Sequence, residues 1–419
     1  MSRKLFPAAL AAALSVTFQL GVPAQAAPQG PAMAPADASA PEGVQVAQSQ
    51  AGFNQWKQQF RAKALRAGIS PATFDLAFRN VRYNPDVVRR DRKQSEFTKS
   101  LWDYLDSAVS ASRINNGRAG WNEWKQSLSA IEARYGVDAK VVVAIWGLES
   151  AYGSYTGDFK VIESFATLAY DGRRRKFAEE QLIAALKIVQ SGDKHPDRIL
   201  GSWAGAMGHT QFIPTSFQAY AVDFTGDGTR DIWYPPDALA STANYLAKHG
   251  WRKGHPWGLE VVLPAGFDYA QADQSNRQAV STWNARGVRL TDGQPLPNYG
   301  EAAIIAPAGA RGPTFAVFHN FRVIKRYNNA TSYAIAVGHL GDRIAGGPDF
   351  RAKWPRGDQP LSRSEKVELQ KRLTARGFST RGVDGKIGPN TISAIRSYQR
   401  SAGLVPDGYA SKQLLNRLR

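Results

Sequence analysis

The feature that most constrains the fold of this 419-residue chain is an apolar run that ends on an acid. Residues 141–148 contain no charged side chain, and Glu149 follows them directly. In a helix, this acid shares one face with three bulky apolar residues at i−7, i−4 and i−3, namely Val142, Ile145 and Trp146. The sequence therefore predicts a buried helix with a carboxyl group at its end.

The ends of this helix are also marked in the sequence. Asp138 is placed to cap a helix that starts near Ala139, and Gly153 is placed to end it. Apolar surroundings disfavour the charged form of a carboxyl group and raise its pKa, which suits a general acid near neutral pH. The alternative is an acid at the mouth of the helix, paired with Arg or exposed to water, and this stretch alone favours that alternative slightly.

A second stretch, GSWAGAMGHTQFIPTSFQAY from Gly201, is dense in small residues. It carries isolated polar side chains among apolar neighbours, namely Ser202, His209 and Gln211. Small residues let a ligand or another backbone approach closely, and the Gln amide can both donate and accept hydrogen bonds. Ligand contact and a tight helix–helix crossing both fit this pattern.

A third stretch, DFTGDGTRDIWYPPD, opens like an EF-hand loop. Asp223, Thr225 and Asp227 alternate before the turn at Gly228, but the twelfth position is Tyr234 instead of Glu. A larger loop closed by Asp237 would still gather oxygen ligands for calcium. Asp-Gly turns without metal are common, so the pattern alone leaves both readings open.

The N-terminus has the three parts of a secretory signal. Arg3 and Lys4 precede an apolar stretch from residue 5 to residue 20, and Ala24-Gln25-Ala26 forms a small-x-small cleavage site. A short stretch that contains Pro7 disfavours a transmembrane anchor. We expect an exported, soluble periplasmic protein that associates with the cell wall.

Composition narrows the chemistry further. The chain has no cysteine, which excludes disulfides, a thiol nucleophile and a lipid anchor on cysteine. A formal charge of +18 favours anionic partners such as the cell wall. We expect no nucleic-acid partner, because no helix-turn-helix, RNA-binding or zinc-finger pattern is present. The six His include no HExxH pair, which argues against a metallohydrolase.

Patterning divides the chain into segments. We expect a signal peptide at 1–26, a disordered Ala/Pro-rich linker at 27–50, a mainly helical catalytic domain at 51–352 and a small β-rich insertion at about 252–320. A proline-containing linker at 353–361 leads to a module at 362–419. In this module Ser364 is a candidate helix cap, and two weak repeats each pair an Asp-Gly turn with a helix. Their expected core is Leu373, Ile392, Ile395, Leu414 and Leu418.

Together, GLESAYG, the long stretch from Gly201 to Trp251, and FRVIKRYNNATSYAIAVGHLGDRI resemble the lytic murein transglycosylase B family over residues 53–350. The last segment resembles the common three-helix peptidoglycan-binding domain. The resemblance implies a mainly α (α+β) fold with a lysozyme-like core. It also implies cleavage of the β-1,4 bond between N-acetylmuramic acid and N-acetylglucosamine, with a 1,6-anhydro ring formed on the muramic acid. Peptidoglycan glycan strands are the implied partner.

The resemblance also assigns residues. The catalytic glutamate of the family matches Glu149. Its saccharide-contacting positions match Ser202, Gln211, Tyr245, Tyr327 and Tyr333, with a looser match at Tyr104. Its calcium loop matches Asp223, Thr225, Asp227, the Thr229 carbonyl and Asp237. The chemistry needs no cofactor, and calcium would have a structural role.

Two other functions fit the same sequence. A lysozyme-type hydrolase would cut the same bond with a positioned water, and a wall-binding scaffold would not turn over at all. Ordinary glycosidases use a second carboxylate as nucleophile or base. The acids near Glu149 in sequence are Asp158, Glu163 and Asp171, which sit among Gly, Lys or Arg and read as solvated surface acids. The N-acetyl oxygen of the substrate could serve instead.

Overall fold

The computed structural model describes residues 49–92 and 100–419, so the predicted signal peptide and nearly all of the predicted N-terminal linker lie outside the described residues. The chain forms two compact units. Of the described residues, the smaller, here the helical unit, contains 49–92, Thr156–Met207 and Gln211–Ala219. The larger, here the main unit, contains 100–155, Gly208–Thr210 and Tyr220–Arg419.

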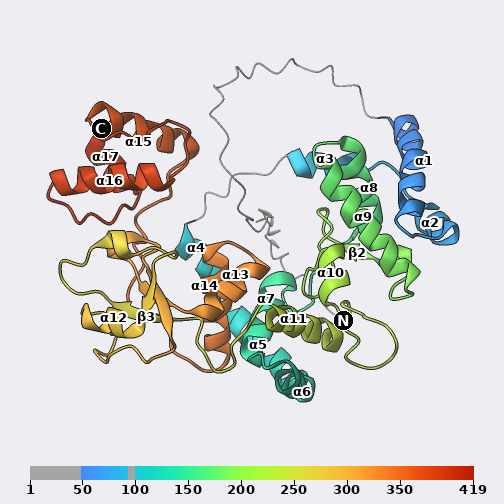
Figure 1. The fold of residues 1–419 in the computed structure, drawn as a ribbon, viewed down its shortest axis with the longest axis horizontal. Helices are drawn as coiled ribbons and strands as arrows, with labels where there is room; N and C mark the ends of the chain where they lie inside the picture. The colour runs from blue at the N-terminus through green and yellow to red at the C-terminus, as the bar shows by residue number, and fades with distance from the viewer. Residues whose placement is uncertain (1–48, 93–99) are drawn as a thin grey trace, which may run out of the picture. The chain divides into compact units, whose positions relative to one another are not determined.

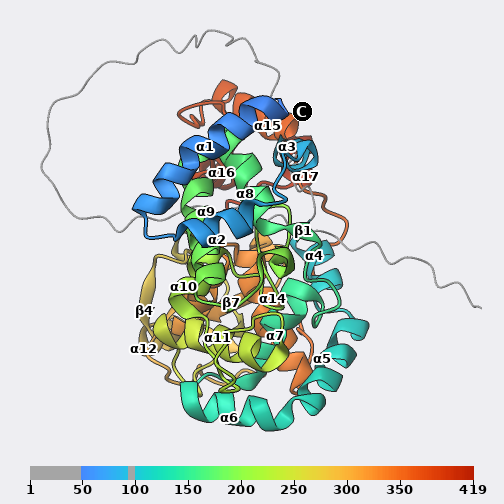
Figure 2. The same cartoon turned by 90° about the vertical axis from the view of Figure 1, so that its right-hand side faces the viewer.

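The helical unit is built around aromatic side chains. Its elements are α1 (Gln50–Arg66), α2 (Pro71–Phe78), α3 (Pro85–Arg92), β1 (Phe159–Lys160), α8 (Val161–Asp171), α9 (Arg175–Gln190), η1 (Pro196–Arg198), β2 (Leu200–Gly201) and α10 (Pro214–Tyr220). Figure 2 shows the blue helices α1 and α2 beside the green helices α8 and α9. Phe60 stacks on Trp56 and contacts Phe74 and Phe78, which joins α1 to α2. Ser70 caps α2, and Pro71 occupies its first turn, where proline is favoured.

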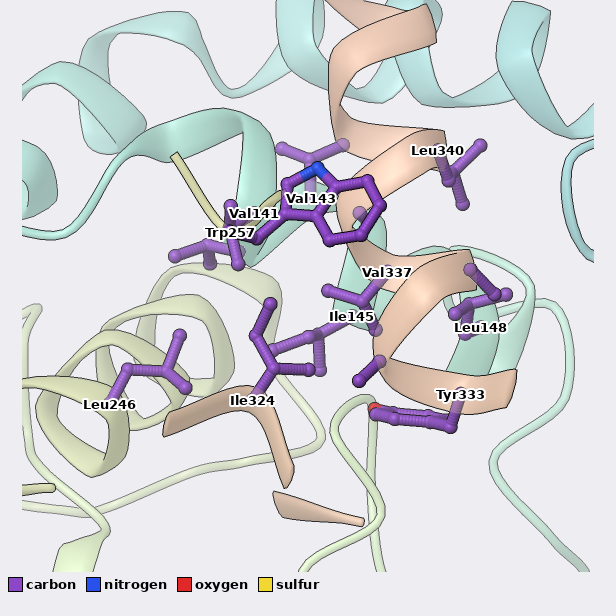
Figure 3. Close-up of a cluster of buried hydrophobic side chains, with 14 of the residues drawn as sticks. Val141, Val143, Ile145, Leu148, Leu246, Trp257, Ile324, Tyr333, Val337 and Leu340 are labelled. Carbon is purple, nitrogen blue, oxygen red and sulfur yellow. The ribbon is translucent and has the colours of Figure 1, made fainter. Parts of the chain in front are cut away.

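The main unit surrounds the apolar helix. Its helices are α4 (Leu101–Ala108), α5 (Ala111–Glu123), α6 (Lys125–Tyr135), α7 (Ala139–Ser150), α11 (Pro235–Lys248), α13 (His319–Tyr327) and α14 (Thr331–Ile344). Helix α7 packs against α5, α6, α11 and α14, which explains why its apolar residues face several directions. Figure 3 shows this core, with Val141, Ile145 and Leu148 among side chains from the neighbouring helices.

A five-stranded antiparallel sheet forms within the same unit, in the order β4-β6-β7-β3-β5. Its strands are β3 (Gly258–Val262), β4 (Arg277–Ala279), β5 (Arg289–Leu290), β6 (Glu301–Ile305) and β7 (Thr314–Val317). Helix α12 (Val280–Ala285) and the short turns η2 (Tyr269–Gln271) and η3 (Gly309–Arg311) connect them. Trp283 and Phe318 are fully buried in a separate core under the sheet. The predicted fold class, mainly helical with a small β-rich insertion, is confirmed.

The C-terminal module consists of α15 (Arg363–Ala375), α16 (Pro389–Ser401) and α17 (Lys412–Leu418), drawn in red in Figure 1. Two sequence expectations are wrong in detail. The cap of α15 is Ser362, not Ser364, because Ser362 and Glu365 form a reciprocal capping box. Ile392 is only half-buried, and the core consists of Leu361, Leu369, Leu373, Ala394, Ile395, Leu414, Leu415 and Leu418.

The two weak repeats share one hydrogen-bond device. Gln370 accepts from the N–H of Gly385 at 2.8 Å and donates to Asp384 at 3.0 Å. Gln399 accepts from the N–H of Gly408 at 2.8 Å and donates to Asp407 at 2.6 Å. Each buried glutamine thus ties its helix to the Asp-Gly turn that follows it.

Among the helices of residues 49–92 and 100–419, none has the length and apolarity needed to cross a membrane.

Candidate active site

Helix α7 places Glu149 one residue before its end. Asp138 holds the N-cap position, as expected, but its side chain does not cap the helix. Its Oδ2 accepts from the indole Nε1 of Trp251 at 2.8 Å, and Glu132 accepts the N–H of Ala139 at 3.1 Å instead. The far end differs too, because the helix stops before the predicted Gly153. Ala151 already has a φ of 50°, in the left-handed region.

The carboxyl group of Glu149 is partly buried at this turn. The three residues that share its face, Val142, Ile145 and Trp146, are all buried. Burial raises the pKa of Glu149 to about 7, and a hydrogen bond from Tyr333 partly opposes that rise. In the part of the chain that the structure describes, Glu149 makes no ion pair with Lys or Arg, so no basic side chain opposes the rise of its pKa.

Three tyrosine hydroxyls surround this carboxyl group. Tyr333 on α14 donates to Oε1 of Glu149 at 2.5 Å. Tyr327 at the end of α13 donates to the Thr210 carbonyl at 2.5 Å. The Tyr104 hydroxyl on α4 is buried and has no hydrogen-bond partner among the described residues. Burial raises the pKa of all three tyrosines, and the negative charge of Glu149 raises them further. Tyr104, Tyr327 and Tyr333, which the resemblance assigns to saccharide contact, therefore lie close enough to Glu149 for its charge to act on them.

Tyr245 on α11 extends this group. Its ring lies edge-on to Tyr327 with centroids 5.0 Å apart and stacks on His249 at 4.2 Å. Its hydroxyl donates to the Arg326 carbonyl at 2.6 Å. A row of partly exposed aromatic rings of this kind suits contact with a sugar face.

Ser202 and Gln211 lie in the helical unit. The N–H of Ser202 donates to the Ala206 carbonyl at 2.8 Å, and its Oγ accepts from the Ala206 N–H at 3.1 Å. Gln211 has a φ of 52°, and its Nε2 donates to the Thr156 carbonyl at 3.2 Å. A residue other than glycine whose backbone is held in the left-handed region is a sign of a functional constraint.

The aspartate-rich loop is closed by its own backbone. Asp223 accepts from the N–H groups of Gly226 at 2.6 Å and Gly228 at 2.9 Å, and such bonds lower its pKa. Asp227 accepts from the N–H of Thr229 at 2.8 Å. The hydroxyl of Thr225 also turns inward, donating to Asp223 at 3.4 Å. The carboxylates of Asp223 and Asp227 are therefore occupied by hydrogen bonds from within the loop.

Asp237 closes the loop as expected. It is fully buried and accepts from the N–H groups of Phe224 at 3.0 Å, Thr225 at 3.1 Å and Asp231 at 2.9 Å. Burial raises its pKa in spite of these bonds. The oxygen donors suit calcium chemically. Across residues 49–92 and 100–419, no group of three Asp, Glu, His or Cys side chains is arranged to hold a metal ion.

The three acids considered as second carboxylates have other contacts. Asp171 is buried and pairs with Arg92 at 2.7 Å, so its reading as a solvated acid is wrong. Glu163 accepts from Asn84 Nδ2 at 3.0 Å, and Asp158 is exposed. These contacts give Asp171 and Glu163 structural roles.

Sequence reasoning missed two supports of the site. Arg113 on α5 donates to the Gly147 carbonyl within α7, and its own carbonyl accepts from Tyr152 at 2.8 Å. His209 contacts Trp146 at 2.9 Å. Both pairs join residues more than 30 positions apart, so no local pattern reveals them. His209 stood out only as a polar residue in an apolar stretch.

Comparisons with known proteins identify the families that this chain resembles. A family model described as the transglycosylase SLT domain matches residues 52–342. A peptidoglycan binding domain model matches residues 362–418. Membrane-bound lytic murein transglycosylase B of Escherichia coli (strain K12) is 34% identical over 249 residues, which cover 58% of this chain. The chain spans 66% of the length of that relative, just under two thirds.

Two solved structures are similar over longer stretches. SltB3 from Pseudomonas aeruginosa, in complex with NAG-NAM-pentapeptide, has a TM-score of 0.83 and 53% identity, covering 88% of this chain and 99% of that chain. Escherichia coli Slt35, in complex with calcium, has a TM-score of 0.61 and 30% identity, covering 69% of this chain and 92% of that chain. Because the family model spans well over half of its residues, this chain belongs to the family of the transglycosylase SLT domain.

Proposed function

We propose that the protein is a lytic transglycosylase of peptidoglycan. It would cleave the β-1,4 bond between N-acetylmuramic acid and N-acetylglucosamine and leave 1,6-anhydro-muramic acid ends. The observation that carries the proposal is a single carboxyl group, Glu149, partly buried, hydrogen-bonded to the Tyr333 hydroxyl and with a pKa raised to about 7. Such a group can act first as acid and then as base at neutral pH.

The chemistry needs no second enzyme carboxylate. Protonated Glu149 gives its proton to the glycosidic oxygen as the bond from that oxygen to C1 breaks. The N-acetyl carbonyl oxygen of the substrate bonds to C1 on the opposite face. The Glu149 carboxylate then takes the proton of the 6-hydroxyl, whose oxygen bonds to C1 and displaces the N-acetyl oxygen. No water is consumed, and Glu149 ends protonated as it began.

The tyrosines would hold the carboxyl group and the glycan during these steps. Tyr333 fixes Oε1, which leaves Oε2 to face the substrate oxygen. The Tyr104 hydroxyl is buried without a hydrogen-bond partner among the described residues, and a sugar oxygen that reached it would satisfy it. The Tyr245 ring would contact further sugar atoms.

The relatives support the substrate. SltB3 has been solved with NAG-NAM-pentapeptide and with NAG-anhNAM-pentapeptide. We propose that glycan strands of this kind are the substrate here and that the module at 362–419 binds the same polymer. We also propose that the protein works in the periplasm, on the cell wall, after export.

Digestion of purified sacculi tests the function. Wild type should release muropeptides that are lighter by one water than their hydrolysed counterparts, and Glu149→Gln should release none. The matched control is Glu163→Gln, a partly buried acid that bonds Asn84 and should keep full activity. Products with reducing ends would instead establish a lysozyme-type hydrolase. Binding to sacculi without any product from wild type would establish a scaffold.

Structural calcium is a separate part of the proposal. The loop from Asp223 to Asp237 carries oxygen donors, and the relative Slt35 has been solved with calcium. Binding here would require its carboxylates to turn from the loop N–H groups toward a shared point. Calcium should then raise the Tm of wild type but not of Asp223→Ala, and equal Tm values with calcium and with chelator would contradict it.

A further inference from the structure

One ring in the main unit connects the catalytic helix to the aspartate-rich loop. Trp146 Nε1 donates to Nδ1 of His209 at 2.9 Å, and Nε2 of His209 lies 3.0 Å from the Trp233 carbonyl. An indole N–H can only donate and a carbonyl can only accept. The two partners therefore require a neutral ring with its proton on Nε2.

The backbone and ring of His209 also contact the turn that follows the catalytic acid. Its carbonyl accepts from Ser150 Oγ at 2.6 Å, and that same Oγ accepts from the N–H of Gly153 at 3.0 Å. A Cβ on Gly153 would lie 2.2 Å from Cε1 of the ring. His209 therefore touches the chain on both sides of Glu149, three residues before it and one residue after it.

The other side of the ring contacts the aspartate-rich loop. The N–H of His209 donates to the Ile232 carbonyl at 2.9 Å. Trp233, which accepts from the ring, donates its own N–H to Asp231 at 3.0 Å. The N–H of Asp231 in turn donates to Asp237 at 2.9 Å. A continuous chain of hydrogen bonds thus runs from α7 through one imidazole to the buried acid that closes the loop.

The surroundings favour the neutral ring. Burial lowers the pKa of His209, although the Trp233 carbonyl and the charge of Asp231 act in the opposite direction. A second ring proton would point from Nδ1 at the indole N–H, so two donors would face each other. The ring is therefore held in one tautomer by geometry and by its environment.

We propose that His209 is a positioning residue that acts as its Nε2–H tautomer. It fixes the last turn of α7 and thereby the direction of the Glu149 carboxyl group relative to the loop at 223–237. The inference rests on the proposed function only in taking Glu149 as the acid. Small displacements of a catalytic group can reduce the rate about a hundredfold, which makes such a support measurable.

Three substitutions separate the two bonds of the ring. His209→Asn keeps an acceptor near Nδ1, and His209→Gln keeps a donor near Nε2, while His209→Leu removes both. We expect His209→Asn to retain kcat within about fivefold. The Gln and Leu variants should lose kcat by roughly ten- to a hundredfold, with KM for soluble glycan changed less than about threefold. His195→Leu, at an exposed histidine, is the control and should match wild type.

Nitrogen NMR of histidine-labelled wild type gives a readout independent of turnover. The His209 signals should show an unprotonated Nδ1 and a protonated Nε2 near neutral pH. The opposite tautomer, or a charged ring, would overturn the inference, as would equal kcat values for all three variants. A loss of kcat that follows Tm equally in the Asn and Gln variants would also overturn it. If Glu149→Gln is fully active, the proposed function fails, while the tautomer result still decides the role of His209.

Discussion

The Tyr333 hydroxyl donates a hydrogen bond of 2.5 Å to Oε1 of Glu149, and it is the group that opposes the effect of burial on this acid. Tyr333 is itself buried in the core beneath α14, as Figure 3 shows. Its hydroxyl therefore has little freedom to leave the carboxyl group. The proton affinity of Glu149 is set by two opposing influences, burial and one phenolic donor.

Removing that donor should change the pH dependence of turnover. In Tyr333→Phe the pKa of Glu149 rises, because only the bond that stabilised the carboxylate is lost. We expect the alkaline limb of kcat/KM to move up by roughly one pH unit, given that hydrogen bonds to charged groups contribute about 1.5–3 kcal/mol. Tyr135→Phe, which removes a buried hydroxyl without a partner among the described residues, is the control. An alkaline limb that stays in place or moves down would contradict the expectation.

The same acid should make stability depend on pH. Its pKa is about 7 in the folded protein and 4.5 ordinarily, so the folded state keeps a proton that the unfolded chain releases. The stabilisation of the folded state by this retained proton is fully present below pH 4.5 and is lost as pH rises through 7. Relative to Glu149→Gln, the free energy of unfolding of wild type should fall by up to roughly 3 kcal/mol across this window. Urea unfolding at a series of pH values measures it, and a constant difference between the two proteins would refute it.

The apolar face that Glu149 shares was predictable because it follows from periodicity within α7, whereas the catalytic role proposed for Glu149 came from the family resemblance. Val142, Ile145 and Trp146 are buried on the face that the spacing assigns to Glu149. The fold class followed likewise from the change of pattern after Trp251. Local signals of this kind lie within a few turns of chain, where geometry is fixed by the helix itself.

Contacts between distant segments could not be predicted in the same way. Asp138 occupies the cap position, yet its carboxylate bonds Trp251, 113 residues away. The bond between Trp146 and His209 spans 63 residues. Tertiary packing determines such partners. A capping rule based on neighbouring residues does not include an indole donor from a distant segment that competes for the same carboxylate.

The backbone at Gln211 should show a conflict between stability and function. Its φ of 52° costs about 1–2 kcal/mol for a residue with a Cβ. Gln211→Gly removes this strain, whereas Gln211→Ala keeps it, and both lose the bond to the Thr156 carbonyl. We expect the Gly variant to be more stable than the Ala variant by about 1 kcal/mol, with both reduced strongly in turnover. Thermal unfolding and product release measure this, and a Gly variant with wild-type turnover would show that the amide is dispensable.

The C-terminal module should be separable from catalysis by one core substitution. Leu415 is fully buried among the few apolar side chains that hold the three helices together. Leu415→Ala should lower the free energy of unfolding of the module by about 2–5 kcal/mol. This loss is comparable to the whole stability that such a small core supplies. The module would then unfold, and sedimentation with purified sacculi should show lost binding, while turnover of short soluble glycans stays unchanged. Val405→Ala, at a side chain that is 55% exposed, is the control and should bind as wild type does. Undiminished binding by a Leu415→Ala protein whose module has unfolded would place wall binding elsewhere in the chain.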